Sequence, residues 1–197
     1  GGVPNALQVY PWGSPVPGIG MLINQTDVAA NRAAGGRLAT TVQQYQARYH
    51  GRPVFLAGHS GGGGVVVFAL ESLAYKSGAP VEGAFLLSAS LSSSYNLSTA
   101  LAMSNRGIVN FYNPNDTLML GQGTGTFGNV DGGMGASCGR TGLATSSPKV
   151  FNVNIASLHQ GLDDAHSLVV QPRVVKRTTA PWILAPMWPA QWEIARP

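Results

Sequence analysis

The feature that most constrains the fold is a glycine-rich turn between an apolar segment and a helical one. Val54–Ala57 is a short continuous apolar run, which is typical of a strand covered on both faces. Gly58–Gly62 (GHSGG) follows directly, and Val65–Ala74 is apolar and long enough for a helix that ends near Ser77-Gly78. Glycine tolerates the close backbone contacts of a sharp strand-to-helix turn. The sequence therefore predicts a strand, a tight turn with Ser60 at its apex, and a helix.

Apolar runs and helical patterns alternate along the rest of the chain. Asn31–Tyr49 has helical composition, with apolar residues at spacings of three and four. Pro11–Gly20 and Gly121–Gly142 are glycine-rich and predict loops. Parallel strands need long return connections, so the alternation predicts an α/β fold with a mostly parallel central sheet flanked by helices. Besides Val54–Ala57, the predicted strands are Ala6–Tyr10, Ala84–Leu87, Ile108–Tyr112 and Val150–Ile155.

Composition limits the size and the partners of this fold. The chain has 197 residues, 44% of them hydrophobic, so we expect a single domain over residues 1–197 with one sizeable core. Only 10% of residues are charged, and 26 glycines and 13 prolines predict many turns. The net charge is +4, but the nearest basic cluster, Arg173, Lys176 and Arg177, is typical of a solvated face. No nucleic-acid-binding module is recognisable, so no nucleic-acid partner is expected.

No apolar stretch is long enough to cross a bilayer. The best candidate, Val65–Leu70, falls far short of the roughly 20 residues required, so we expect a soluble protein without stable membrane insertion. No charged-then-apolar leader is visible, so a signal peptide is either absent or already removed, and Gly1-Gly2 suggests a fragment or a processed form. The sequence predicts neither the compartment nor the oligomeric state.

Cofactor chemistry finds no support in the sequence. Cys138 is the only cysteine, which excludes an intrachain disulfide and a cysteine-rich metal site, and we expect it to be structural. No metal-ligand spacing emerges, and no dinucleotide-binding fingerprint is satisfied. We therefore expect no metal and no redox cofactor.

The position of Ser60 suggests a nucleophile. A tight turn projects its hydroxyl above the edge of the sheet, and the following helix start favours negative charge nearby, with the Gly61 N–H as one donor to an oxyanion. The alternative is a glycine-rich helix start that is capped by Ser60 or binds a phosphate. No Gly-Lys-Ser/Thr follows the turn, so the nucleophile is the favoured hypothesis.

A serine nucleophile needs a histidine to accept its proton and an acid to orient that histidine. Of the four histidines, His50 lies upstream of the turn, and the side chain of His59 should point away from the neighbouring hydroxyl. Both are expected to be structural or at the surface. His159 and His166 remain, and His166 is favoured because it lies about ten residues past the last predicted strand and just before a predicted helix.

Asp116 is the favoured acid. It follows Ile108–Tyr112 within a turn-forming segment, and a carboxylate just past a strand lies at the same edge of a parallel sheet as Ser60. Alternatively, it simply caps the next segment. The less favoured acids are Asp131 in the glycine-rich loop, and Asp163 and Asp164, which are close enough to His166 to shape its loop.

These segments resemble those of α/β-hydrolase esterases and lipases, and the resemblance covers most of the chain. Val54–Gly62 (VFLAGHSGG) is similar to the strand and nucleophile elbow of that family, and Gly107–Asp116 (GIVNFYNPND) to the strand that carries the acid. Asp163–Leu168 (DDAHSL), followed by Ala180–Pro186 (APWILAP), resembles the base loop and the closing helix.

The resemblance implies a catalytic triad of Ser60, Asp116 and His166 that hydrolyses a small-molecule carboxylic ester through an acyl-enzyme. In this family a second oxyanion donor comes from an early loop, but only one predicted strand precedes the strand before Ser60. Two interpretations stay open. Either Trp12-Gly13-Ser14 supplies that loop, its first two residues acting as donors, or N-terminal strands of the α/β-hydrolase fold are missing.

The sequence leaves alternatives for the function. A thioesterase or an acyltransferase would use the same triad, and a non-catalytic binding protein can be built on the same fold. Trp182, Trp188 and Trp192 are more typical of a segment packed against the body than of a lipid-facing surface, so they do not indicate a lipase.

Overall fold

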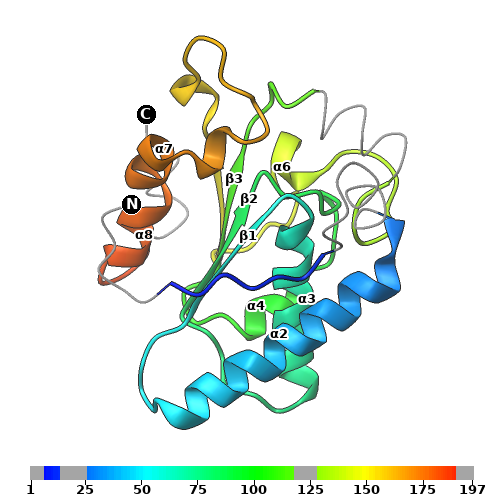
Figure 1. Cartoon of the computed structure of the whole chain (residues 1–197), viewed down its shortest axis with the longest axis vertical. Coiled ribbons are helices and arrows are strands. Elements are labelled where there is room, and N and C mark those ends of the chain that lie inside the picture. The colour runs from blue at the N-terminus through cyan, green and yellow to red at the C-terminus, as the bar shows by residue number, and fades with distance from the viewer. Residues whose placement is uncertain (1–6, 14–25, 118–127, 190–197) are drawn as a thin grey trace.

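The computed structural model describes residues 7–13, 26–117 and 128–189, and a four-stranded sheet lies at its centre (Figure 1). All neighbouring strands pair in parallel, and their spatial order is their order in the chain, β1-β2-β3-β4. The fold class is therefore α/β with an open parallel sheet, as the sequence predicted. The strands are β1 (Phe55–His59), β2 (Gly83–Leu87), β3 (Ile108–Tyr112) and β4 (Val150–Asn154).

The register brings the carboxyl ends of the strands to one edge. His59 pairs with Leu87, Leu87 pairs with Phe111, and Tyr112 pairs with Asn154. The segments that leave β1, β2, β3 and β4 therefore start at the same edge of the sheet. In an open α/β sheet this is the edge at which ligands bind.

Two long helices, one before β1 and one directly after the glycine-rich turn, cover one face of the sheet. These are α2 (Val28–Arg48) and α3 (Gly61–Tyr75), with the short α4 (Ser98–Ala102) beside them (Figure 1). Ala84 and Leu86 of β2 pack with α2 and α3 in one buried cluster. α2 begins at Asp27, whose Oδ1 accepts the Ala30 N–H at 2.8 Å as an N-cap.

The other face is covered by the C-terminal part of the chain. Phe85 and Leu87 of β2 point to this face, where they join a second buried cluster with residues from the segment after β4. The helices α7 (Pro172–Arg177) and α8 (Thr179–Leu184) belong to this layer (Figure 1). Trp182 and Trp188 pack on Phe151, with ring centroids 5.2 and 5.9 Å away, so the predicted packing of the tryptophans is confirmed for these two. Trp192 lies outside the described residues.

The structure differs from the predicted elements at the N-terminus. Leu7–Tyr10 forms no strand, and Ala6 lies outside the described residues. Leu7 and Val9 are 91% and 82% exposed, so within the described residues this apolar run has neither a partner strand nor a buried face to stabilise an extended ladder. Of the predicted loop Pro11–Gly20, only residues 11–13 are described, and they carry no helix or strand.

The described part of the predicted loop Gly121–Gly142 begins at residue 128 and contains one short helix, α6 (Cys138–Thr141). Two short 3-10 turns, η2 (Ala156–Leu158) and η3 (Leu168–Val170), follow β4. None of the helices described is both long and apolar enough to pass through a bilayer.

Candidate active site

Ser60 occupies a strained turn between β1 and α3. Its φ of 54° and ψ of −126° lie in a region that non-glycine residues rarely adopt, at a cost of about 1–3 kcal/mol. Two backbone bonds hold the turn in place. The Ser60 N–H donates to the Leu87 carbonyl at 3.0 Å, and the Ser60 carbonyl accepts the Ser90 N–H at 3.1 Å. The turn is therefore fixed to the end of β2 and to the segment that follows it.

Glycine is required two residues before the serine. A Cβ atom on Gly58 would lie 2.1 Å from the carbonyl oxygen of Gly62, closer than any non-bonded contact allows. The strand and the first turn of α3 approach one another at this point, which brings Ser60 to the apex. The helix itself starts at Gly61, four residues before the predicted Val65, because the glycines form its first turn.

The predicted acid and the predicted base are in contact. His166 Nδ1 lies 2.6 Å from Asp116 Oδ2, and both residues are buried, with 6% and 2% of their surface exposed. Asp116 comes from the turn after β3, and His166 from the loop after β4. A short hydrogen bond shielded from water fixes the orientation and the tautomer of an imidazole, with the proton on Nδ1.

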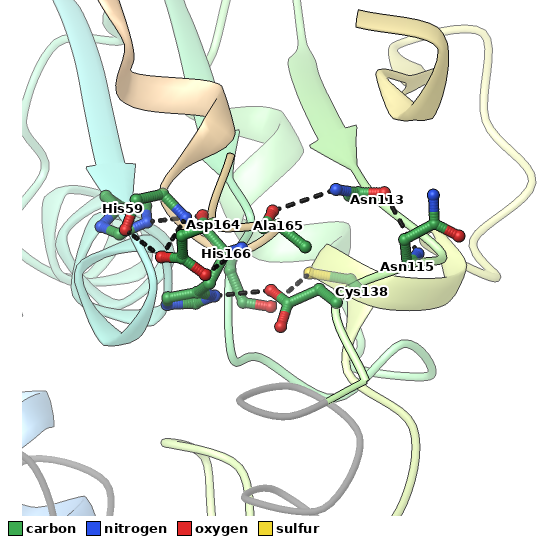
Figure 2. Close-up of polar contacts among 10 residues, drawn as sticks. His59, Asn113, Asn115, Cys138, Asp164, Ala165 and His166 are labelled. Carbon is green, nitrogen blue, oxygen red and sulfur yellow. Dashed lines mark hydrogen bonds and ion pairs between the residues drawn. The ribbon is translucent and has the colours of Figure 1, made fainter. Parts of the chain in front are cut away.

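Asn113 ties these two loops together. Its side-chain amide donates to the Ala165 carbonyl at 3.0 Å, and its Oδ1 accepts the Asn115 N–H at 3.1 Å (Figure 2). The first bond joins the turn after β3 to the residue before His166. The second closes the turn that carries Asp116. Nothing in the sequence alone marked Asn113 for this role, because its partner is 52 residues away.

The two acids next to His166 shape its loop, as expected. Asp164 accepts the His166 N–H at 3.2 Å and the Ser167 hydroxyl at 2.6 Å, and the Ser167 hydroxyl holds the pKa of Asp164 below its usual value (Figure 2). Asp163 accepts the Gln160 N–H at 2.7 Å and pairs with Arg173. Asp131 accepts the Ser92 N–H at 2.9 Å, far along the chain from this loop.

His59 lies against His166, which the sequence did not predict. The two ring centroids are 4.8 Å apart, and His59 Nε2 is 3.2 Å from the backbone oxygen of His166 (Figure 2). Burial, and then the charge of His166, hold the pKa of His59 below its ordinary 6.5. Because His59 is bonded to Ser60 along the chain, its contact places the base loop over the carboxyl end of β1.

The three residues predicted as a triad therefore lie at one edge of the sheet. Asp116 and His166 touch directly, and His59, the residue before Ser60, packs against His166. The chain has two further histidines, His50 and His159. His50 is exposed between α2 and the start of β1, at the opposite edge of the sheet, and His159 follows η2.

The predicted oxyanion residues surround the same turn. Gly61 is the first residue of α3, so its N–H has no acceptor within the helix. The Trp12 indole packs against the turn, with Cη2 2.8 Å from the place where a Gly61 Cβ would sit and Nε1 3.2 Å from that of Gly62. Gly13, next to it, is exposed. Trp12 therefore lies beside the turn that carries Ser60, and its role as a donor stays a prediction.

Cys138 is buried, and burial raises the pKa of its thiol to about 12, which agrees with the structural role expected for it. In the ranges 7–13, 26–117 and 128–189, no group of three or more His, Cys, Asp or Glu side chains is arranged to hold a metal ion.

No family model, no curated protein and no solved structure matches this chain. The structure alone therefore establishes its class, an α/β fold with a four-stranded parallel sheet flanked by helices. That architecture is compatible with the α/β-hydrolases and is shared by other α/β proteins.

Proposed function

We propose that this chain is a serine hydrolase of the α/β-hydrolase type that cleaves carboxylic esters through Ser60, His166 and Asp116. The observation that carries the proposal is the buried contact of 2.6 Å between Asp116 and His166, at the sheet edge where the strained Ser60 turn lies. A buried acid that orients an imidazole, at the same sheet edge as a serine, is the arrangement that can activate a hydroxyl.

The chemistry follows from the direction of the hydrogen bond. Because the Nδ1–H of His166 donates its hydrogen bond to Asp116, the Nε2 lone pair of His166 is free to accept the proton of the Ser60 hydroxyl. The serine oxygen then attacks the ester carbonyl carbon, and the resulting oxyanion accepts hydrogen bonds from the Gly61 N–H and from a second donor near Trp12. His166 returns its proton to the leaving alcohol, and water, activated in the same way, releases the acid.

The burial of the pair supports this assignment of roles. The Asp116 carboxylate stabilises the imidazolium that forms on His166, because the interaction between opposite charges is strong where water is excluded. The strain at Ser60 is the kind of cost that a fold retains where function requires a particular geometry. A thioesterase or an acyltransferase would use the same groups, and analysis of the products formed with thioester and ester substrates separates them from an esterase.

A covalent probe tests the proposal. We expect a fluorophosphonate to label the wild-type protein at Ser60, as located by peptide mass spectrometry, and p-nitrophenyl butyrate to be hydrolysed. Ser60→Ala should abolish both labelling and turnover. Ser72→Ala, in the last turns of the same helix, is the matched control and should retain both. A folded wild-type protein that stays unlabelled, or is labelled only at another residue, would refute the proposed function and favour a binding protein.

A further inference from the structure

We infer that His59 is a positioning residue for the base: it holds the His166 backbone over the nucleophile turn and thereby sets the distance between the imidazole and the Ser60 hydroxyl. The inference rests on the proposed function and deepens it. Its evidence is separate from the Asp116 contact, because it concerns the opposite side of His166.

The first argument is the hydrogen bond. His59 Nε2 lies 3.2 Å from the backbone oxygen of His166, and a carbonyl oxygen can only accept. The proton of His59 is therefore on Nε2. This bond connects two residues that are 107 positions apart in the chain, the last residue of β1 and the centre of the loop after β4. A long loop held to a strand end in this way loses much of its freedom to move.

The second argument is that His166 is held from three directions. Asp116 contacts its ring nitrogen at 2.6 Å, Asp164 accepts its N–H at 3.2 Å, and His59 donates to its carbonyl. Asp164 belongs to the same loop, and Asp116 belongs to the turn after β3. Only His59 of these three is attached to the nucleophile, so it is the contact that couples the position of the base to that of Ser60.

The third argument is the packing of the two rings. Their centroids are 4.8 Å apart and their planes are tilted by 44°, so the His59 ring forms one wall of the space that the base occupies. With this wall and the Asp116 bond in place, rotation of the His166 ring would cost either a hydrogen bond or a steric clash.

The charge state of His59 suits this role. The ionisable groups that face it are His166, Asp116 and Asp164. Burial, followed by the charge of His166, lowers the pKa of His59, whereas the two carboxylates act in the opposite direction. His59 is therefore neutral at neutral pH. A permanent cation at this position would oppose the positive charge that His166 acquires during the reaction.

Two substitutions separate the hydrogen bond from the ring. His59→Phe retains a ring of similar size but removes the donor, and His59→Gln places an amide N–H near the position of Nε2. In the full chain we expect His59→Phe to lower kcat for p-nitrophenyl butyrate about tenfold, with KM changed by less than about twofold, because misplacement of a base affects the chemical step. His59→Gln should recover most of the lost kcat. The rate of fluorophosphonate labelling should follow kcat in the three proteins.

A spectroscopic measurement adds a readout that does not depend on turnover. The Nδ1 proton of His166 in its short bond to Asp116 should give a low-field proton resonance, and we expect His59→Phe to shift or broaden it while His59→Gln restores it. Unchanged kcat and an unchanged resonance in folded His59→Phe would overturn the inference, even if Ser60 is labelled. An unlabelled wild-type protein would instead refute the hydrolase proposal itself.

The wild-type protein provides a test if the variants do not fold. Long-range ¹H–¹⁵N correlation spectra identify which ring nitrogen of a histidine carries the proton. At pH 7 we expect neutral His59 with its proton on Nε2. A proton on Nδ1 alone, or a doubly protonated ring, would contradict the inference, because the first cannot make the bond to His166 and the second would place two cations together.

Discussion

At the scale of single residues, the proposed role of the Asp116 carboxylate is to orient His166 as the base. Asp116→Asn keeps the size of the side chain, but the amide can present its NH₂ group to Nδ1 and so favour the wrong tautomer. We expect kcat/KM for p-nitrophenyl butyrate to fall by about 10³- to 10⁴-fold, the magnitude associated with loss of the orienting acid in such triads. Steady-state kinetics measures the change.

Asp131→Asn is the control for this substitution. Asp131 also accepts a backbone hydrogen bond, from Ser92 at 2.9 Å, but it contacts no member of the proposed triad in the described part of the chain. It should therefore retain activity within about threefold, since changes remote from the reacting groups have small effects on the chemical step. Equal losses in Asp116→Asn and Asp131→Asn would indicate general damage to the fold rather than loss of the acid.

The contact between Asp116 and His166 could be predicted from the sequence, whereas the contact of His59 could not. Asp116 and His166 follow from chain order and from the rule that loops after parallel strands meet at one edge, so their contact was predictable. His59 was expected to be structural or at the surface, because a side chain next to Ser60 should point away from the serine hydroxyl. Its contact with His166 depends on how the loop after β4 folds back over β1, and no local pattern records that path.

At the scale of elements, the packing of α2 on α3 provides a sharp comparison between neighbouring glycines. A Cβ on Gly35 would lie 2.5 Å from the Cβ of Phe68, whereas the nearest atom to a Cβ on Gly36 is the Ser72 hydroxyl oxygen at 3.8 Å. Gly35→Ala should destabilise the protein by about 1–3 kcal/mol through overpacking. Gly36→Ala should stabilise it by about 0.5–1 kcal/mol, since alanine is the better helix former.

Urea denaturation of both variants measures these changes. If Gly35→Ala proves as stable as Gly36→Ala, then α2 and α3 do not pack closely between Gly35 and Phe68. The activity of Gly36→Ala should equal that of the wild type, because the substituted position lies next to Ser72, near the end of α3 that is away from the turn that carries Ser60.

The four strands of the sheet were predicted correctly, whereas the strand predicted at the N-terminus was not, and burial explains the difference. The four strands of the sheet are apolar runs that both helical layers cover, so composition identified them within one or two residues. Leu7–Tyr10 has the same kind of composition but pairs with no strand in the described part of the chain, and a short apolar run does not by itself reveal whether a partner strand exists. The start of α3 was misplaced because glycine lowers helix propensity, and tertiary packing outweighed that preference.

At the scale of the whole molecule, protonation of buried and paired groups couples the stability of the fold to pH. The pKa of His59 is lowered by burial and then by His166, so the unfolded chain binds this proton more readily than the folded chain. Stability should therefore decrease as the pH falls below 6.5, the ordinary value for histidine. The carboxyl groups of Asp163 and Asp164 affect the stability of the fold at lower pH. Their pKa values are lowered by hydrogen bonds, from the Gln160 N–H and the Ser167 hydroxyl respectively, so their contribution is present above 3.8 and is lost below it.

These two ranges can be separated by experiment. We expect the urea midpoint of the wild-type protein to decrease between pH 7 and pH 5 and to decrease again below pH 4. His59→Phe cannot bind the first proton, so its midpoint should vary less between pH 7 and pH 5 while keeping the decrease at lower pH. Identical profiles for the two proteins over the upper range would mean that His59 is accessible to solvent in the folded state. That outcome would contradict the packing of the base loop over β1, on which the geometry of the proposed site depends.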